Sequence, residues 1–113
     1  MNTADKLDMS IKKLLSQKAG DIFTINNKWL CRLKSDANDA SWKKDVNSPA
    51  MNLELPVNVH SNEGIEDNLD GIVFVQSDMS LSRKYYASLY MKSSLDSKWK
   101  SMLSVVDIKF KDN

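Results

Sequence analysis

The stretch MNLELPVNV at residues 51–59 decides the fold prediction, because apolar side chains occupy every second position along it. These positions share one face of an extended strand, and they are Met51, Leu53, Leu55, Val57 and Val59. The alternation predicts a strand with one face buried and the other exposed to water. Pro56 stands on the second face. Because proline has no N–H for a neighbouring strand, we predict an edge strand or a bulged one.

A β-hairpin is predicted upstream of this strand. Residues 21–25 and 28–34 are rich in β-prone side chains, and Asn26 and Asn27 separate the two segments. Asparagine tolerates the positive φ that a tight hairpin turn requires. In the second segment the apolar side chains alternate with basic ones, so we expect Cys31 to point inward and the basic face to point outward.

Three more strands are predicted downstream. Residues 72–75 (IVFV) form a continuous apolar run after Gly71, which is typical of a strand covered on both faces. Residues 81–94 have helical spacing in part, but only a strand gathers their apolar side chains on one face, so we prefer the strand. Residues 106–110 alternate again and predict a final strand.

Helices are predicted near both ends of the chain. The apolar positions of the first recur at helical spacing, and they are Leu7, Ile11, Leu14 and Leu15. Gly20 is expected to stop this helix. The second helix is short, begins at Ser94, and has the apolar positions Leu95, Trp99, Met102 and Leu103.

The segment 35–50 is polar and is predicted to be a loop or a short helix that ends at Pro49. Trp42 lies within it. This side chain either pins the loop to the core or stands exposed as an anchor for a partner, and we prefer pinning.

These elements predict an α+β fold with one domain over residues 1–113. We expect a mostly antiparallel sheet of about five to six strands. The N-terminal helix and the short C-terminal helix should pack on one face of this sheet. The other face should meet water and carry the functional surface.

Basic and tyrosine side chains are expected on that exposed face. The candidate binding residues there are Lys28, Arg32, Lys34, Lys84, Tyr86, Tyr90 and Lys92, with Lys109 and Lys111 on the last strand. Lysine on an exposed strand face also serves solubility alone, which is the simpler interpretation. Tyrosine, however, is enriched among the residues that dominate binding energy at interfaces.

Charge is segregated along the chain. Residues 50–81 contain six acidic residues and none of the sixteen Lys and Arg residues, although the formal net charge is only +1. The acidic loop after the alternating strand adds Glu63, Glu66 and Asp67 to the candidate binding residues. Such segregation can steer association with a charged partner.

Several function classes are disfavoured by composition. One Cys and one His leave few metal ligands, and three glycines provide no phosphate-binding loop, so we expect neither a metal nor a cofactor. The first twenty residues contain no continuous apolar run, so no membrane association is expected and a cytoplasmic location is predicted.

The preferred hypothesis is a small binding protein without catalytic activity, such as an inhibitor, an immunity protein or an adaptor, that recognises another protein. The first alternative is a nucleic-acid-binding module that uses the basic and tyrosine residues. A weaker alternative is an enzyme in which His60 pairs with Glu63 or Glu66 as a general base. A homodimer formed through residues 51–59 is a further hypothesis, because a free edge strand can pair with its own copy.

Overall fold

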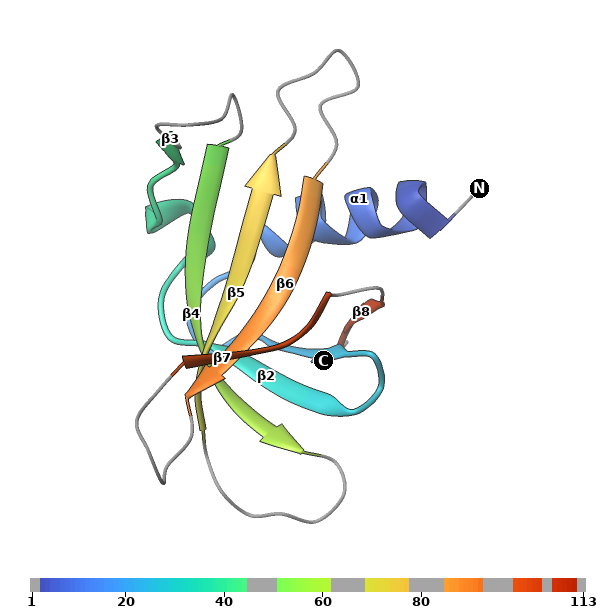
Figure 1. Cartoon of the computed structure of the whole chain (residues 1–113), viewed down its shortest axis with the longest axis vertical. Helices are drawn as coiled ribbons and strands as arrows, with labels where there is room; N and C mark the ends of the chain where they lie inside the picture. The colour runs from blue at the N-terminus through green and yellow to red at the C-terminus, as the bar shows by residue number, and fades with distance from the viewer. Residues whose placement is uncertain are drawn as a thin grey trace.

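The computed structural model describes residues 3–44, 51–61, 69–77, 85–92, 99–104 and 107–111 (Figure 1). Its elements are α1 (Thr3–Leu14), β1 (Ile22–Ile25), β2 (Trp29–Leu33), the 3-10 helix η1 (Ala37–Asp39), β3 (Lys43–Lys44), β4 (Met51–Ser61), β5 (Leu69–Ser77), β6 (Tyr85–Lys92), β7 (Trp99–Ser104) and β8 (Ile108–Phe110). The strands form one curled antiparallel sheet in the order β7-β6-β5-β4-β2-β1-β8, with β3 paired to β4. The α+β class is therefore confirmed, with more strands than predicted.

Strand β4 contains the alternating stretch, and its burial follows the predicted period of two. Leu53 and Val57 are buried, whereas Glu54 and Pro56 are exposed. The strand is internal, however, because β2 pairs along one side of it and β5 along the other. The edge-strand prediction is therefore wrong, and a homodimer through residues 51–59 loses its basis, since it requires a free edge.

Pro56 is tolerated in an internal strand because it lies opposite the end of β2, where the pairing between β2 and β4 stops. The N–H of Lys34 donates to the Pro56 carbonyl at 3.0 Å, immediately after β2 ends at Leu33. On the same side of β4, the next strand β3 pairs only with Met51 and Asn52. The position without an N–H thus lies just beyond the last residue of β2 that pairs with β4.

The hairpin of β1 and β2 is confirmed. Asn26 and Asn27 adopt φ values of 53° and 55°, and the Lys28 N–H closes the turn on the Ile25 carbonyl at 3.1 Å. The Asn26 side chain also accepts the backbone N–H of Asp107 at 2.9 Å. The turn is therefore tied to the segment that enters β8, and β8 completes the sheet beside β1.

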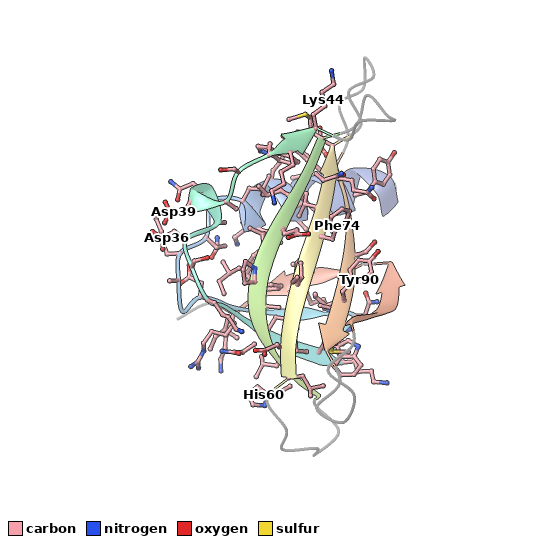
Figure 2. All side chains as sticks on the ribbon, turned by 60° about the vertical axis from the view of Figure 1, so that its left-hand side comes forward. Asp36, Asp39, Lys44, His60, Phe74 and Tyr90 are labelled. Carbon is pink, nitrogen blue, oxygen red and sulfur yellow. The ribbon has the colours of Figure 1, made fainter. Side chains whose placement is uncertain are left out.

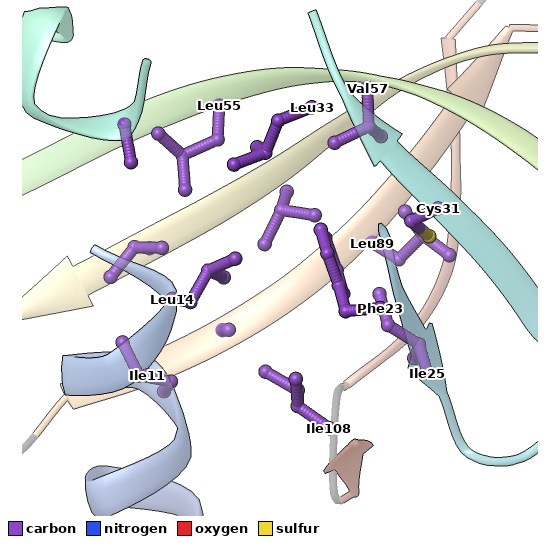
Figure 3. Packing of buried hydrophobic residues seen from close by; sticks show 14 of the residues in the cluster. Ile11, Leu14, Phe23, Ile25, Cys31, Leu33, Leu55, Val57, Leu89 and Ile108 are labelled. Carbon is purple, nitrogen blue, oxygen red and sulfur yellow. The ribbon is translucent and has the colours of Figure 1, made fainter. Parts of the chain in front are cut away.

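Helix α1 packs on the concave inner face of the sheet and crosses behind β6 in Figure 1. It contributes Ile11 and Leu14 to a buried cluster that the strands complete (Figure 3). The Asp8 carboxylate accepts the backbone N–H of Tyr85 at 2.9 Å, which fixes the helix to the start of β6. Among the described residues, no helix is both long enough and apolar enough to cross a bilayer.

The predicted C-terminal helix is not formed where the structure describes this region. Residues 99–104 are strand β7, which pairs with β6, and residues 93–98 lie outside the described part. The register shifts between Leu89 and Tyr90, which shows that one residue is inserted on the β7 side. An inserted residue breaks the period of two along a strand. The apolar residues Met102 and Leu103 then lie three and four positions after Trp99, which is the spacing typical of a helix.

Two further predictions are corrected in part. Strand β5 was expected to be covered on both faces, but Ile72 and Phe74 remain half-exposed on the side away from α1. The first helix ends at Leu14, before Gly20, which instead adopts φ +88° in the turn that leads into β1. The strand prediction for the region of β6 is confirmed, with Ala87, Leu89 and Met91 buried.

Candidate binding surface

The outer face is the side of the sheet that is turned away from α1. Alternate side chains of β2, β4, β5 and β6 point to it, and Figure 2 shows Phe74, Tyr90 and His60 from this side. Most of the predicted binding residues that the structure describes lie on this face. They separate into an aromatic group on β5 and β6 and a basic group on β2.

The aromatic patch consists of Ile72, Phe74, Tyr86 and Tyr90. Ile72 lies directly opposite Tyr90 in the β5–β6 register. The rings of Phe74 and Tyr90 meet edge to face, with centroids 6.0 Å apart and an interplanar angle of 82°. With Glu54 and Ile72 they line a shallow hollow, while Tyr86 is 46% exposed nearby on β6. This geometry holds two aromatic side chains in place on regular strands.

One strand, β4, separates the aromatic patch from the basic side chains of β2. Two strand spacings set β2 about 10 Å from β5, and three set it about 14 Å from β6. The prediction of a basic, tyrosine-bearing face is confirmed for Lys28, Arg32 and Tyr86, which are all exposed. Among the described residues, the structure does not bring Arg32 into direct contact with Tyr86 or Tyr90.

The cations of the basic group differ in their partners. The Lys34 ammonium pairs with the Asp70 carboxylate. The Lys28 ammonium lies 5.2 Å from the centroid of the Trp29 ring. The Arg32 side chain forms no hydrogen bond or ion pair in the part of the chain that the structure describes. Arg32 is therefore the cation in this group that can take an external anion.

A second hollow lies on the outer face across β1, β2 and β4. The residues that line it are Ile22, Leu30, Cys31, Arg32, Asn58 and His60, although the Cys31 side chain itself is buried in the core. Arg32 is opposite Asn58 and Leu30 is opposite His60 in the β2–β4 register. His60 thus neighbours a cation and an amide. The acids that sequence analysis paired with it, Glu63 and Glu66, lie outside the described residues.

Three other predicted binding residues are not described in full. Lys84 and Asp67 lie outside the described residues. Lys92 ends β6 and pairs with Trp99 in register, but its side chain is not described. No group of three or more His, Cys, Asp or Glu side chains that could hold a metal ion is found over the described ranges.

Trp42 combines a contact that attaches its loop to β6 with an exposed surface, so it has features of both predicted alternatives. Its ring centroid lies 6.0 Å from that of Tyr85 at the start of β6. About a third of the residue, 36%, stays exposed. The contact attaches the connection between η1 and β3 to the same strand that carries Tyr86 and Tyr90.

Cys31 lies on the inner face and is fully buried, as predicted. Its burial removes water from the thiol and raises the pKa of Cys31 from 9.0 to about 12. A neutral, inaccessible thiol is a poor nucleophile. The structure therefore gives Cys31 a packing role.

We expect two measurable consequences of this buried thiol. In the folded protein Cys31 should not react with Ellman's reagent at pH 8, whereas in urea it should react fully. Above pH 9 the unfolded chain ionises its thiol while the folded chain does not. The free energy of unfolding of the wild-type protein should therefore fall between pH 9 and 12. This fall should be steeper than that of Cys31→Ala by up to about 1.4 kcal/mol per pH unit. Equal pH slopes in urea titrations of the two proteins would contradict the shift.

Ile72, Phe74 and Asn58 were missed as surface residues of interest. A signal for the first two was present, because Asp70 and Gln76 occupy the same alternate positions of β5 and are polar. Extending the period of two across the full strand would have assigned Ile72 and Phe74 to the outer face. The alternation is not visible within residues 72–75 alone, because all four are apolar.

Comparison of the chain with protein-family models, with curated proteins and with solved structures finds no match in any of the three.

Proposed function

We propose that this chain binds another protein through the aromatic patch on β5 and β6. The observation that carries the proposal is the edge-to-face pair of Phe74 and Tyr90, half-exposed beside a shallow hollow. Aromatic side chains dominate binding energy at interfaces, especially where they are held rigid before the partner arrives. Both side chains stand on strands whose opposite faces are packed in the core, which supplies that rigidity.

Charge supports the same proposal. Arg32 lies on the outer face of β2, one strand away from the aromatic patch across β4, and Lys28 is exposed just before β2. Cations at the rim of an interface accelerate association with an acidic partner and fix its orientation. An inhibitor, an immunity protein and an adaptor all act by such recognition, without chemistry of their own. The acidic residues Glu63, Glu66 and Asp67 stay in the proposal as candidates from the sequence.

Nucleic-acid binding is the second candidate. Stacking modules place phosphate-binding cations close to the aromatic rings. Here Glu54 lines the hollow beside Phe74 and Tyr90, and the Lys34 ammonium is paired with Asp70. A carboxylate at the rings repels a phosphate backbone, so these two observations favour a protein partner. An enzyme centred on His60 has less support, because no carboxylate or hydroxyl side chain lines its hollow among the described residues.

The test compares partner binding by variants of the patch. Wild-type protein is immobilised on a resin and incubated with lysate from its source cells, and it should retain a partner. The affinity of the two purified proteins is then measured. We expect Phe74→Ala and Tyr90→Ala each to raise the dissociation constant at least about 30-fold, which corresponds to a loss of about 2 kcal/mol. Gln76→Ala, on the same face of β5, is the matched control and should change it little.

Two outcomes would count against the proposal. A partner that binds the Phe74 and Tyr90 variants as tightly as wild type would remove the aromatic patch from the interface. Binding of random single-stranded nucleic acid that weakens steeply with salt and is lost in these variants would favour the second candidate. Thermal melts of each variant check that half-exposed positions were changed without unfolding the sheet.

A further inference from the structure

The hollow across β1, β2 and β4 has features that the aromatic patch does not share. Three polar side chains with hydrogen-bond donors surround it on two adjacent strands, Arg32 on β2 and Asn58 and His60 on β4. Antiparallel pairing places Arg32 beside Asn58, with His60 two residues further along the same face. Donors from one guanidinium, one amide and one imidazole can therefore reach a single bound group.

These donors are not used within the part of the chain that the structure describes. Neither Arg32, Asn58 nor His60 makes a side-chain hydrogen bond or ion pair there. Asp70 lies across from Asn58 on the β5 side, two strands from Arg32, and its carboxylate is engaged by the Lys34 ammonium. This described acid of β5 thus has its own cation, and the guanidinium keeps its fork of N–H donors.

The charge around the hollow also favours an anion. Lys111 lies near Ile22, beside a shallow depression that both residues line together with Asp21, whose carboxylate accepts the Lys18 N–H at 2.9 Å. Lys109 is opposite Thr24 on β1, although its ammonium has Asp107 at 3.7 Å. Lys28 precedes β2 and is exposed. Positive potential from these side chains attracts a negatively charged group to Arg32.

We propose that this hollow binds one carboxylate group, with the Arg32 guanidinium as its main partner. A carboxylate matches the planar fork of a single guanidinium and needs only one full counter-charge, whereas a phosphate dianion gains most from several. The hollow is small, about 180 Å³, and Ile22 and Leu30 provide apolar walls for the carbon chain that bears the carboxylate. Asn58 and His60 are positioned to donate to the remaining oxygen lone pairs.

Two sources can supply this chemistry. The carboxylate belongs either to a free small acid or to an Asp or Glu side chain of a protein partner. The site does not depend on the aromatic patch, because its residues lie on other strands. Loss of binding at Arg32 and loss of binding at Phe74 are therefore separate results, and either proposal can fail alone.

The experiment is an NMR titration of the full chain with sodium acetate, with sodium chloride adjusted to hold ionic strength constant. We expect saturable shifts of the His60 ring protons and of the backbone amides of Arg32 and Asn58, with millimolar affinity. Arg32→Gln should weaken acetate binding at least tenfold, and Arg32→Lys should weaken it less, since the charge is kept and the fork is lost. Lys43→Gln removes an exposed lysine on β3 that does not line the hollow, so it is the matched control and should retain binding.

Three results would overturn the assignment. Linear shifts that chloride reproduces would mean that no site exists. Unchanged acetate binding in Arg32→Gln, with an unchanged thermal melt, would remove Arg32 from it. Saturation by inorganic phosphate at much lower concentration than by acetate would replace the carboxylate with a phosphate. If Arg32→Gln fails to fold, Asn58→Ala and His60→Ala provide the same comparison.

A second arm separates the two sources. The probes are glutarate as a free acid and an acetylated, amidated Gly-Glu-Gly peptide, with Gly-Gln-Gly as its uncharged control. Tighter binding of the glutamate peptide than of glutarate, lost in Arg32→Gln, assigns the site to an acidic protein segment. The reverse order, with the same loss, assigns it to a small acid. Binding of the Gln peptide equal to that of the Glu peptide would contradict carboxylate recognition.

Discussion

Gly71→Ala should lower the free energy of unfolding by about 1–3 kcal/mol, and Gly71→Val by more, because this position has no room for a side chain. Gly71 is buried in β5 between Val57 on β4 and Met91 on β6. A Cβ atom there would lie 2.6 Å from a methyl carbon of Val59 and 3.1 Å from one of Val57. Both valines are buried and stiff at χ1, so neither can move aside cheaply. Urea titration measures the loss.

Two comparisons test this cause. Gly20→Ala replaces a glycine at φ +88° that has open space around it, so it should cost only the backbone strain of about 1 kcal/mol. Val59→Ala introduced together with Gly71→Ala removes the clashing methyl groups. We expect a favourable coupling of about 1 kcal/mol or more between these two changes. Additive losses in the double variant, or a Gly71→Ala protein as stable as wild type, would contradict the steric account.

Phe23→Ala should destabilise the chain by about 3–5 kcal/mol, because it empties the space of a fully buried aromatic ring. Phe23 is 0% exposed on β1, the strand that joins β2 to β8. Its ring centroid lies 6.1 Å from that of Phe110 on β8. Loss of the ring therefore weakens both the central packing and the attachment of the last strand (Figure 3). Chemical unfolding gives the size of the effect.

Phe110→Ala is the matched control, since it removes the other ring of the same pair. Phe110 is only partly buried, so its loss should cost clearly less than that of Phe23. Phe23→Leu keeps most of the apolar volume and should also cost less. Equal losses for Phe23→Ala and Phe110→Ala would show that the contact between the rings, and not the burial of Phe23, determines the effect.

The stability of the core and the proposed binding share one strand. In β5, Gly71, Val73 and Val75 face the core, and the alternate residues Ile72 and Phe74 face outward. A change that displaces the buried face of β5 also displaces the aromatic patch. Core variants are therefore unsuitable as binding tests, and outer-face variants such as Phe74→Ala leave the packed side chains in place.

Local periodicity was sufficient to predict most elements. The period of two assigned β4, β6 and β8, the paired asparagines assigned the turn between β1 and β2, and the helical spacing assigned α1. It also placed Arg32, Tyr86 and Tyr90 on an outward face. These predictions hold because each depends on neighbours within a few residues along the chain.

The local residue pattern gave wrong predictions for two segments whose structure depends on pairing with distant strands. Pro56 indicated an edge strand, yet it lies within the sheet, opposite the point at which β2 ends. The spacing in residues 99–104 indicated a helix, yet pairing with β6 across a bulge makes them a strand. In both segments, backbone hydrogen bonds to a strand distant in sequence set the outcome.

An amphipathic helix, alternating strands, a buried thiol and a basic outward face can all be predicted from the residue pattern. Which outward residues meet depends on the way the strands assemble. Strand order separates Arg32 from Tyr90 and joins it to Asn58 and His60, while the β5–β6 register brings Phe74 to Tyr90. The reason is physical, because side-chain alternation is a local property, whereas strand order and register depend on how all the buried faces close around one core.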